Sequence, residues 1–218
     1  MTLRLVCLSD THGLHDRIDV PDGDLLLHAG DFTKRGRESE VEDFARFLER
    51  LPHRHKIVVA GNHDFLFERD AERARELLAN VTYLEDSGVT VEGLAVWGSP
   101  WQPWFHDWAF NLPRGAALAE RWEQIPPSTD VLITHGPAHG LLDVTVRGQR
   151  VGCEELTRAL ERVRPGLHVC GHIHEGYGHV HRDETLCVNA SNCDFGYQPV
   201  QPPIVVEWDA DGPRLANG

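Results

Sequence analysis

Five short segments of the chain place aspartate, asparagine or histidine directly after an apolar run. The segments are SDTH (9–12), GD (30–31), GNHD (61–64), TH (134–135) and GHIH (171–174). The side chains that they could bring to a common site are Asp10, His12, Asp31, Asn62, His63, Asp64, His135, His172 and His174. Imidazoles and carboxylates together suit divalent Zn, Mn, Fe or Ni, whereas Ca and Mg prefer oxygen ligands alone. These residue types therefore predict a transition-metal centre.

The number of candidate ligands predicts two ions rather than one. Seven ligands drawn from these nine side chains already exceed what one ion with an open coordination position uses. Two ions that share a carboxylate are therefore the natural arrangement. Two ions about 3.5–4 Å apart can stabilise the attacking and the leaving oxygen of an in-line displacement at phosphorus. They would also lower the pKa of a bridging water, so that hydroxide is available near neutral pH.

Any one of these segments alone carries little information. A single DxH, GD or GH occurs by chance in many chains, and His172 and His174 alone could lie on alternate faces of a strand end. The five segments occur together, in order, and each follows an apolar run. That combination indicates one shared site.

The elements that must position these residues alternate between strands and helices. Strands are expected at 3–9, 24–30, 56–61, 81–85, 89–98, 130–136, 166–171, 184–190 and 203–209. Amphipathic helices are expected at 38–51, 69–79, 115–124 and 152–163. This alternation predicts a layered α/β fold, in which ligands bind beyond the carboxyl ends of the strands. The five segments should therefore converge at one edge.

Length and charge limit the classes of function. At 218 residues, a single domain over 1–218 is the expected organisation. Lysine and arginine number 21 against 34 aspartates and glutamates, and the net charge of −13 argues against stable binding of nucleic acid or anionic membranes. Any anionic ligand must therefore be attracted locally, for example by bound metal.

Other features predict a cytoplasmic protein. No apolar stretch approaches the ~20 residues that cross a bilayer. The first apolar run begins at Leu3, which leaves no room for a signal peptide ahead of it. The five cysteines form no CxxC pair, and Cys7, Cys170 and Cys187 sit inside apolar runs. We expect them to be reduced and mostly buried.

The five segments resemble the signature of the calcineurin-like metallophosphoesterase superfamily. That signature reads DxH, GD, GNHD or GNHE, H and GHxH, and every block is present here in the same order. The resemblance covers about residues 5–190. It implies an α/β fold built as a four-layer α/β/β/α sandwich, with two mixed sheets flanked by helices and the metals between the sheet ends.

The resemblance also implies a role for each residue. One metal would be bound by Asp10, His12 and His174 and the other by Asn62, His135 and His172, with Asp31 bridging them. His63 would face the phosphate as an acid or charge stabiliser, Asp64 would orient that imidazole, and Asn62 would also contact substrate. Two carboxylates against the four positive charges of the ions leave a net positive site that attracts phosphate.

Further motifs narrow the expected substrate. The stretch GDFTKRG (30–36) has Lys34 where Ser/Thr protein phosphatases carry the second aspartate of GDxxDRG, which disfavours that activity. In contrast, SDTHGLH (9–15), HAGDFT (28–33) and THGP (134–137) look like MPPED-type phosphodiesterases, which are related to class III cyclic nucleotide phosphodiesterases. We expect hydrolysis of cyclic nucleotides or other small phosphodiesters. Mn²⁺ is the expected ion, with Fe, Zn, Ni and Co as alternatives.

A tryptophan-rich stretch at 97–108 has two interpretations. Its rings could form an aromatic wall for a base or an aryl leaving group, with Trp101 as the ring assigned to substrate. For the set as a whole we favour the alternative, in which the rings fold onto the domain or form a dimer contact, because aromatic residues are enriched in both settings.

Three other functions remain as alternatives. A phosphomonoesterase would use the same metal centre on a nucleotide or another small phosphate. A non-catalytic scaffold of the same fold is disfavoured because every ligand position is filled. A DNA nuclease is disfavoured by the acidic charge and by the absence of a basic stripe in the sequence.

Overall fold

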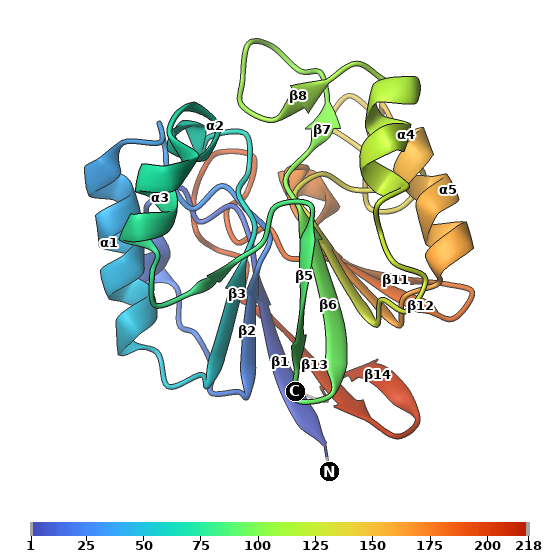
Figure 1. Cartoon of the computed structure of the whole chain (residues 1–218), viewed down its shortest axis with the longest axis horizontal. Coiled ribbons are helices and arrows are strands. Elements are labelled where there is room, and N and C mark those ends of the chain that lie inside the picture. Colours follow the sequence, from blue (N-terminus) through green and yellow to red (C-terminus); the bar gives the residue numbers. More distant parts are fainter. Residues whose placement is uncertain (1, 217–218) are drawn as a thin grey trace.

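Two six-stranded sheets form the centre of the protein in a computed structural model that describes residues 2–216 (Figure 1). The first sheet has the strand order β14 (Gly212–Leu215), β13 (Ile204–Asp209), β1 (Leu3–Leu8), β2 (Leu25–His28), β3 (His55–Val58) and β4 (Thr82–Tyr83). The second has the order β11 (Gly178–Arg182), β12 (Thr185–Asn189), β10 (Leu167–Cys170), β9 (Val131–Thr134), β6 (Leu94–Ser99) and β5 (Ser87–Val91). Parallel and antiparallel pairs occur in each sheet, so both sheets are mixed.

The central strands are apolar at successive positions because both of their faces are covered. Leu25 and Leu27 of β2 enter a core that lies between the two sheets, whereas Leu26 points to the outer face. In the second sheet, Ile133 enters the same central core and Leu132 points to the opposite outer face. The near-continuous apolar runs of the sequence are thus divided between two layers of core.

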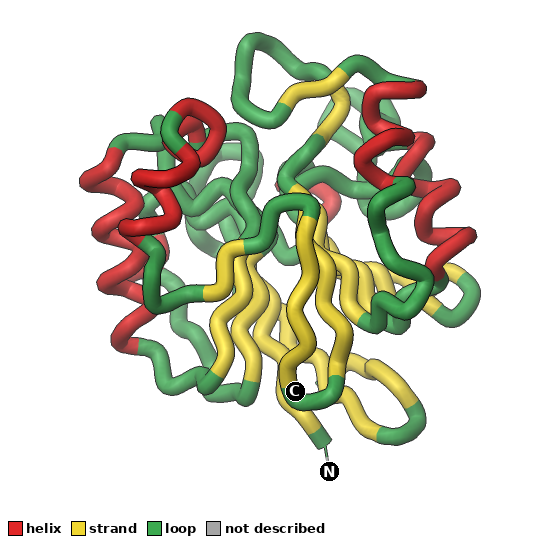
Figure 2. The backbone as a smooth tube through the Cα atoms, in the orientation of Figure 1, coloured by secondary structure: helices red, strands yellow, loops and turns green. Residues whose placement is uncertain are grey.

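Helices cover the two outer faces, as Figure 2 shows in red on either side of the strands. The first sheet is covered by α1 (Glu38–Arg50), α2 (Phe65–Arg69) and α3 (Ala71–Leu77), and the second by α4 (Ala116–Trp122) and α5 (Glu154–Val163). Short 3₁₀ turns, η1 (His15–Arg17) and η2 (His174–Gly176), and a small pair of strands, β7 (Gln102–Pro103) and β8 (Asn111–Leu112), complete the fold. The predicted four-layer α/β/β/α arrangement is confirmed.

Some elements differ from the sequence prediction. The run at 89–98 is not one strand but part of the hairpin of β5 and β6, which turns at Glu92 and Gly93 with φ of 49° and 85°. Two consecutive positive φ values are typical of the tight turns that join hairpin strands. The helix expected at 69–79 is the shorter α3, and α2, which ends just before it, was not predicted. The edge strands β11 and β14 and the short pair β7 and β8 were not predicted, since their sequences lack a long apolar run.

Two further expectations concern membranes and cysteines. Among residues 2–216, no helix has both the length and the apolar character needed to cross a bilayer. All five cysteines are buried and free, in agreement with the prediction that they are reduced.

The outer core of the first sheet provides a test of the packing. Phe44 of α1 is fully buried and stacks on Phe32, with ring centroids 4.3 Å apart. We expect Phe44→Ala to lower the free energy of unfolding by about 3–5 kcal/mol, because it leaves a cavity against β2. Urea unfolding measures the change, and Val200→Ala at an exposed position should cost less than about 0.5 kcal/mol. Similar losses in both variants would contradict this packing.

Candidate metal centre

The five polar segments meet where β1, β2, β3, β9 and β10 end, at the loops drawn in green above the sheets in Figure 2. The backbone turns sharply there. Asp10, His12, Asp31 and His172 have φ of 52°, 44°, 56° and 66°, in the left-handed region that residues with a side chain rarely adopt. Such conformations cost about 1–3 kcal/mol each and gather at functional sites.

Backbone hydrogen bonds between the segments hold these turns in place. The amide of Asp10 donates to the carbonyl of Gly30, and the amide of His12 donates to the carbonyl of Asp31, each at 2.9 Å. Across the two sheets, the amide of His172 donates to Oδ2 of Asp10 at 2.9 Å. The turns are therefore locked by contacts between segments that are far apart in the sequence.

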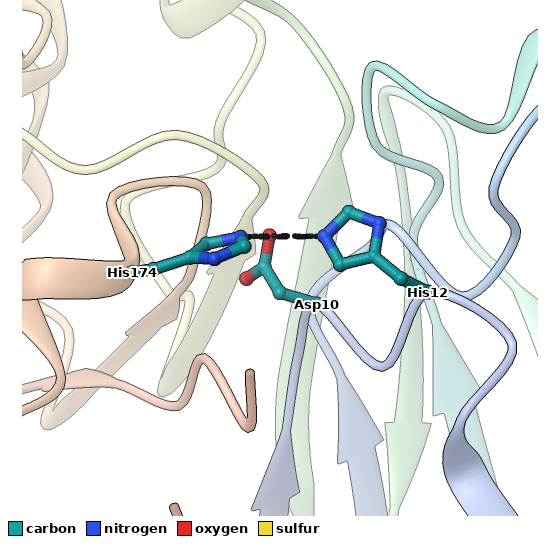
Figure 3. Close-up of side chains that lie close together, drawn as sticks. All are labelled: Asp10, His12 and His174. Atoms are coloured by element: carbon teal, nitrogen blue, oxygen red, sulfur yellow. Dashed lines mark hydrogen bonds and ion pairs between the residues drawn. The ribbon is translucent and has the colours of Figure 1, made fainter. Parts of the chain in front are cut away.

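Asp10, His12 and His174 form the first cluster, shown in Figure 3 with both imidazoles turned toward the carboxylate. Nε2 of His174 lies 3.3 Å and Nε2 of His12 lies 3.8 Å from Oδ1 of Asp10. The hydroxyl of Ser191 donates to the other oxygen, Oδ2, at 2.8 Å, and Oδ1 is buried without a hydrogen-bond partner. A cation between these three groups would satisfy that oxygen.

Asp31, His135 and His172 form the second cluster. Nε2 of His135 lies 3.4 Å from Oδ2 of Asp31 and 2.9 Å from Oδ1 of Asn62. Nδ1 of the same ring donates to the carbonyl of Ala29 at 2.8 Å, which turns Nε2 toward the cluster. A backbone carbonyl on the far nitrogen is the usual support of a metal-binding imidazole.

Asp31 lies between the two clusters. Its Oδ2 is 3.4 Å from Nε2 of His135 on one side and 3.9 Å from Nε2 of His12 on the other. The structure thus brings all seven candidate ligands together, in the two groups that the resemblance implies and with Asp31 at the junction. Their assignment as metal ligands stays a prediction.

The charges of the cluster are balanced without a metal. Burial alone would lower the pKa of His135 and His174, but the charges of Asp31 and Asp10 outweigh it and raise both values to about 9. Burial lowers the pKa of His12 to about 4. Near neutral pH, two carboxylates therefore face two imidazolium groups, and His12 is neutral. Divalent cations would replace the two protons.

His63 and Asp64 do not interact as the resemblance implied. Nδ1 of His63 donates to the carbonyl of Lys34 at 2.8 Å, and Nε2 faces Oδ2 of Asp31 at 4.0 Å. The carboxylate of Asp64 instead accepts hydrogen bonds from the amides of Gly61, Asp31 and Thr33 and from the Thr33 hydroxyl, at 2.7–2.9 Å. The expectation that Asp64 orients His63 is therefore corrected. Asp64 joins the loop that holds Asp31 to the loop that holds Asn62.

Glycines of the motifs allow the ligands to approach the backbone. A Cβ at Gly61 would collide with Oδ1 of Asp31, and a Cβ at Gly171 would collide with Oδ2 of Asp10. The glycines of GNHD and GHIH are thus needed for space beside the carboxylates.

A cavity of about 810 Å³ lies over the centre, with Asp31, His63, His172 and His174 among its lining residues. Its walls carry aromatic rings from two loops. The ring of Trp108 lies 4.4 Å from that of His63, the ring of Phe105 lies 6.3 Å from that of His172, and the ring of Tyr197 lies 4.8 Å from that of His12. An organic group attached to a phosphate in this site would meet those rings.

Trp101, the ring assigned to substrate from the sequence, lies elsewhere. Its Nε1 donates to Asp86 at 2.8 Å, and the Arg121 guanidinium stacks over it at 4.4 Å. Trp101 also packs edge-on against Phe110, so it joins the β7–β8 region to the core and does not face the metal centre.

Sequence reasoning missed Ser191 and Tyr197. Both follow β12, which lies within the apolar run at 184–190, and that run is followed by Ser191 much as the other runs are followed by polar residues. The isolated parallel bridge between Ser9 and Ser191 brings this strand end beside the first motif. A polar residue after a sixth buried strand was the signal that could have identified Ser191.

Comparisons with known proteins agree with this geometry. The model of the calcineurin-like phosphoesterase family matches residues 3–176. The chain therefore belongs to the calcineurin-like phosphoesterase family, which typically binds divalent metals and hydrolyses phosphoesters.

Two relatives and one solved structure are similar to this chain over nearly its whole length. Metallophosphoesterase domain-containing protein 1 of Homo sapiens is 50% identical over 229 residues, which covers 94% of this chain and 70% of the human protein. A UPF0046 protein of Caenorhabditis elegans is 41% identical over 217 residues, which covers 93% of this chain and 74% of the relative. The crystal structure of TT1561 from Thermus thermophilus matches the fold with a TM-score of 0.63 at 16% identity, over 100% of this chain and 99% of that one. The resemblance inferred from the motifs is confirmed.

The donor set fits divalent metals. It offers imidazole nitrogens and two carboxylates in three overlapping groups, the third of which joins His12, Asp31 and His63, and the amide oxygen of Asn62 lies beside His135. Oδ1 of Asp10 and Nδ2 of Asn62 are buried polar atoms that have no hydrogen-bond partner, although the nearby His174 imidazolium offsets the charge of Asp10. A bound cation would provide a partner for Oδ1 of Asp10, and an anionic ligand would accept a hydrogen bond from Nδ2 of Asn62.

The position of Asp64 generates the first prediction for the site. We expect Asp64→Asn to reduce the bound metal and to lower the free energy of unfolding by about 2–4 kcal/mol, because an amide group would face two or more N–H donors. Elemental analysis and urea unfolding measure the two effects. Thr33→Val, which removes one of the four donors, should have a smaller effect of the same kind. An Asp64→Asn protein with full metal content and stability but no activity would instead support a direct action on His63.

The charge balance generates a second prediction. Since the pKa of His135 and His174 is about 9 in the metal-free protein, metal binding near neutral pH must displace both protons. Metal affinity should therefore rise with pH up to about 9 and level off above it. Titration calorimetry in buffers of different ionisation enthalpy should show at least two protons released, and His174→Asn should remove one of them. An affinity that does not change between neutral pH and pH 9 would contradict the charge assignment.

Proposed function

We propose that this phosphoesterase is a dinuclear, metal-dependent phosphodiesterase that hydrolyses cyclic nucleotides or other small phosphodiesters. The observation that carries the proposal is the position of Asp31, between two clusters that each offer further ligands. The mixed imidazole and carboxylate set is compatible with Mn²⁺, the ion that we propose, and also with Fe, Zn, Ni and Co. Two such ions would supply Lewis acidity and a nucleophile that is available near neutral pH.

Two side chains of the GNHD segment would interact with the phosphate group of the substrate. Asn62 is fully buried, and its Nδ2 has no hydrogen-bond partner, so it can donate to a phosphate oxygen. His63 is held through Nδ1 by the carbonyl of Lys34, which leaves Nε2 facing the site. From that position the imidazole can donate a proton or a hydrogen bond to the oxygen of the leaving group. Asp31 keeps the two halves of the site at a fixed separation.

The walls of the site favour a diester over a monoester. A cavity of about 810 Å³ is far larger than a phosphate group needs, and aromatic rings flank both clusters. A diester carries two organic arms that can use such walls, whereas a monoester carries one arm and a second negative charge. Phosphomonoesterase activity is the second candidate, because the metal centre itself does not discriminate between the two.

Turnover of bis(p-nitrophenyl) phosphate and of p-nitrophenyl phosphate by the Mn²⁺-loaded protein tests the proposal. We expect the diester to have the higher kcat/KM. His63→Asn should lower kcat by about 10²–10⁴-fold with unchanged metal content, because it removes a group that acts on the leaving oxygen. Asp31→Asn should lose both metal and activity, which makes it the matched control. Preference for the monoester would overturn the diester assignment, and loss of metal from His63→Asn would make His63 a ligand.

A further inference from the structure

The exposed apolar side chains of the protein are concentrated at the mouth of the cavity. Within residues 2–216, the exposed large apolar residues are Trp104, Phe105, Val144, Val146, Phe195, Tyr197 and Val200. They lie on only three segments, at 104–105, 144–146 and 195–200. Five of them, which we call the apolar collar, line the cavity over the metal centre: Trp104, Phe105, Val146, Phe195 and Tyr197.

The collar is continuous with the centre. Tyr197 lies with its ring 4.8 Å from that of His12 and 5.3 Å from that of His174, on the side of the first cluster. Phe105 lies 6.3 Å from His172, on the side of the second cluster. A molecule whose phosphate lies at His63 must therefore place its substituents against these rings.

Hydrogen bonds hold all three segments in place. Asn111 bonds the backbone of Phe105, with its side-chain oxygen accepting from the amide and its Nδ2 donating to the carbonyl, each at 3.3 Å. The amide of Val146 donates to Glu175 at 2.8 Å. Oδ1 of Asp194 accepts from the amides of Gly196 and Gln198, each at 2.9 Å. The collar is thus fixed by hydrogen bonds, and its side chains stay exposed among the residues that the structure describes.

The charges of the cavity limit which anions it can take. Arg114 lines the cavity but is held by Glu154 and by the carbonyls of Val151 and Gly152. Arg147 is the other arginine of the lining, in a protein whose net charge is −13. Beyond the metal centre, the walls therefore offer apolar surface to a ligand and little positive charge. A chain of several phosphates would find few partners there.

We propose that the apolar collar binds a large apolar substituent of the substrate, so that the preferred substrates are monoanionic phosphodiesters with an aryl or single-chain alkyl arm. Burying the arm removes apolar area of both partners from water, which favours binding in proportion to that area. This inference rests on the proposed phosphodiesterase function and adds the substrate class to it.

A series of alkyl and aryl p-nitrophenyl phosphates tests the inference. The methyl, butyl, octyl and phenyl diesters share one leaving group, so that only the second arm varies, and each is used below the concentration at which it aggregates. We expect kcat/KM of the octyl or phenyl diester to exceed that of the methyl diester by about tenfold or more. A gain for the phenyl diester alone supports an aryl arm, and a gain for the octyl diester as well supports an alkyl arm. Equal values across the series overturn the inference.

Two valines provide a matched pair of variants. Val146 and Val200 are 63% and 66% exposed, but only Val146 lines the cavity. Val146→Ser should reduce the octyl-to-methyl ratio by about threefold, and Val200→Ser should leave it unchanged. Phe195→Ala should reduce the ratio further. Equal effects of the two valine changes would show that the collar is not used.

Ligand binding to the metal-free protein tests the collar independently of the proposed phosphodiesterase activity. The apolar anion 8-anilinonaphthalene-1-sulfonate should bind the metal-free protein, more weakly after Val146→Ser and equally well after Val200→Ser. Failure of the metal-loaded protein to hydrolyse any diester would overturn the proposed function, whereas turnover that ignores the second arm overturns only the collar inference. Self-association that Phe195→Ala abolishes, together with a flat chain-length series, would assign the collar to a second copy of the chain.

Discussion

The buried carboxylate of Asp31 is the group on which the rest of the site depends. It lies between histidines that are carried by different sheets, and its charge outweighs the burial of His135 and raises the pKa of that imidazole. A carboxylate in this position is stable only because its surroundings supply positive charge, as protons or as metal. The Asp31 backbone has φ of 56°, and its amide donates to Asp64. The candidate metal centre is therefore built around one strained and fully supported residue.

Apolar burial in the four-layer fold offsets the free energy that the strained, buried ligands cost. Several candidate ligands adopt left-handed backbone conformations and lie buried, which destabilises the local chain. The strands that carry them are buried on both faces, between a central core and two outer cores, and this apolar burial stabilises the whole edge. Because the sheets face each other, histidines that follow β9 and β10 reach carboxylates that follow β1 and β2. Packing of two sheets thus creates a site that neither sheet contains alone.

The candidate metal centre and the apolar collar are carried by different parts of the chain. The candidate ligands belong to short turns at strand ends, which the core holds rigidly. The apolar collar belongs to three longer segments that lie outside the sheets and are fixed mainly by single polar side chains such as Asn111, Glu175 and Asp194. Segments of this kind can change their sequence with little effect on the core. A common metal centre can therefore serve different substrates.

The sequence by itself determined which residues meet, because a buried strand that ends in a polar residue is a local pattern and parallel strands end at one edge. That pattern predicted a layered α/β fold and one shared edge for the polar residues, and the resemblance of the motifs to a known family implied the grouping of Asp10, His12 and His174 and the position of Asp31 between two clusters. Only the tertiary structure decided where each side chain points. Asp64 turns to the Asp31 and Thr33 amides, and Trp101 turns to Asp86, because their partners lie on segments distant in the sequence. The direction of a loop side chain depends on such long-range partners, which no local pattern records.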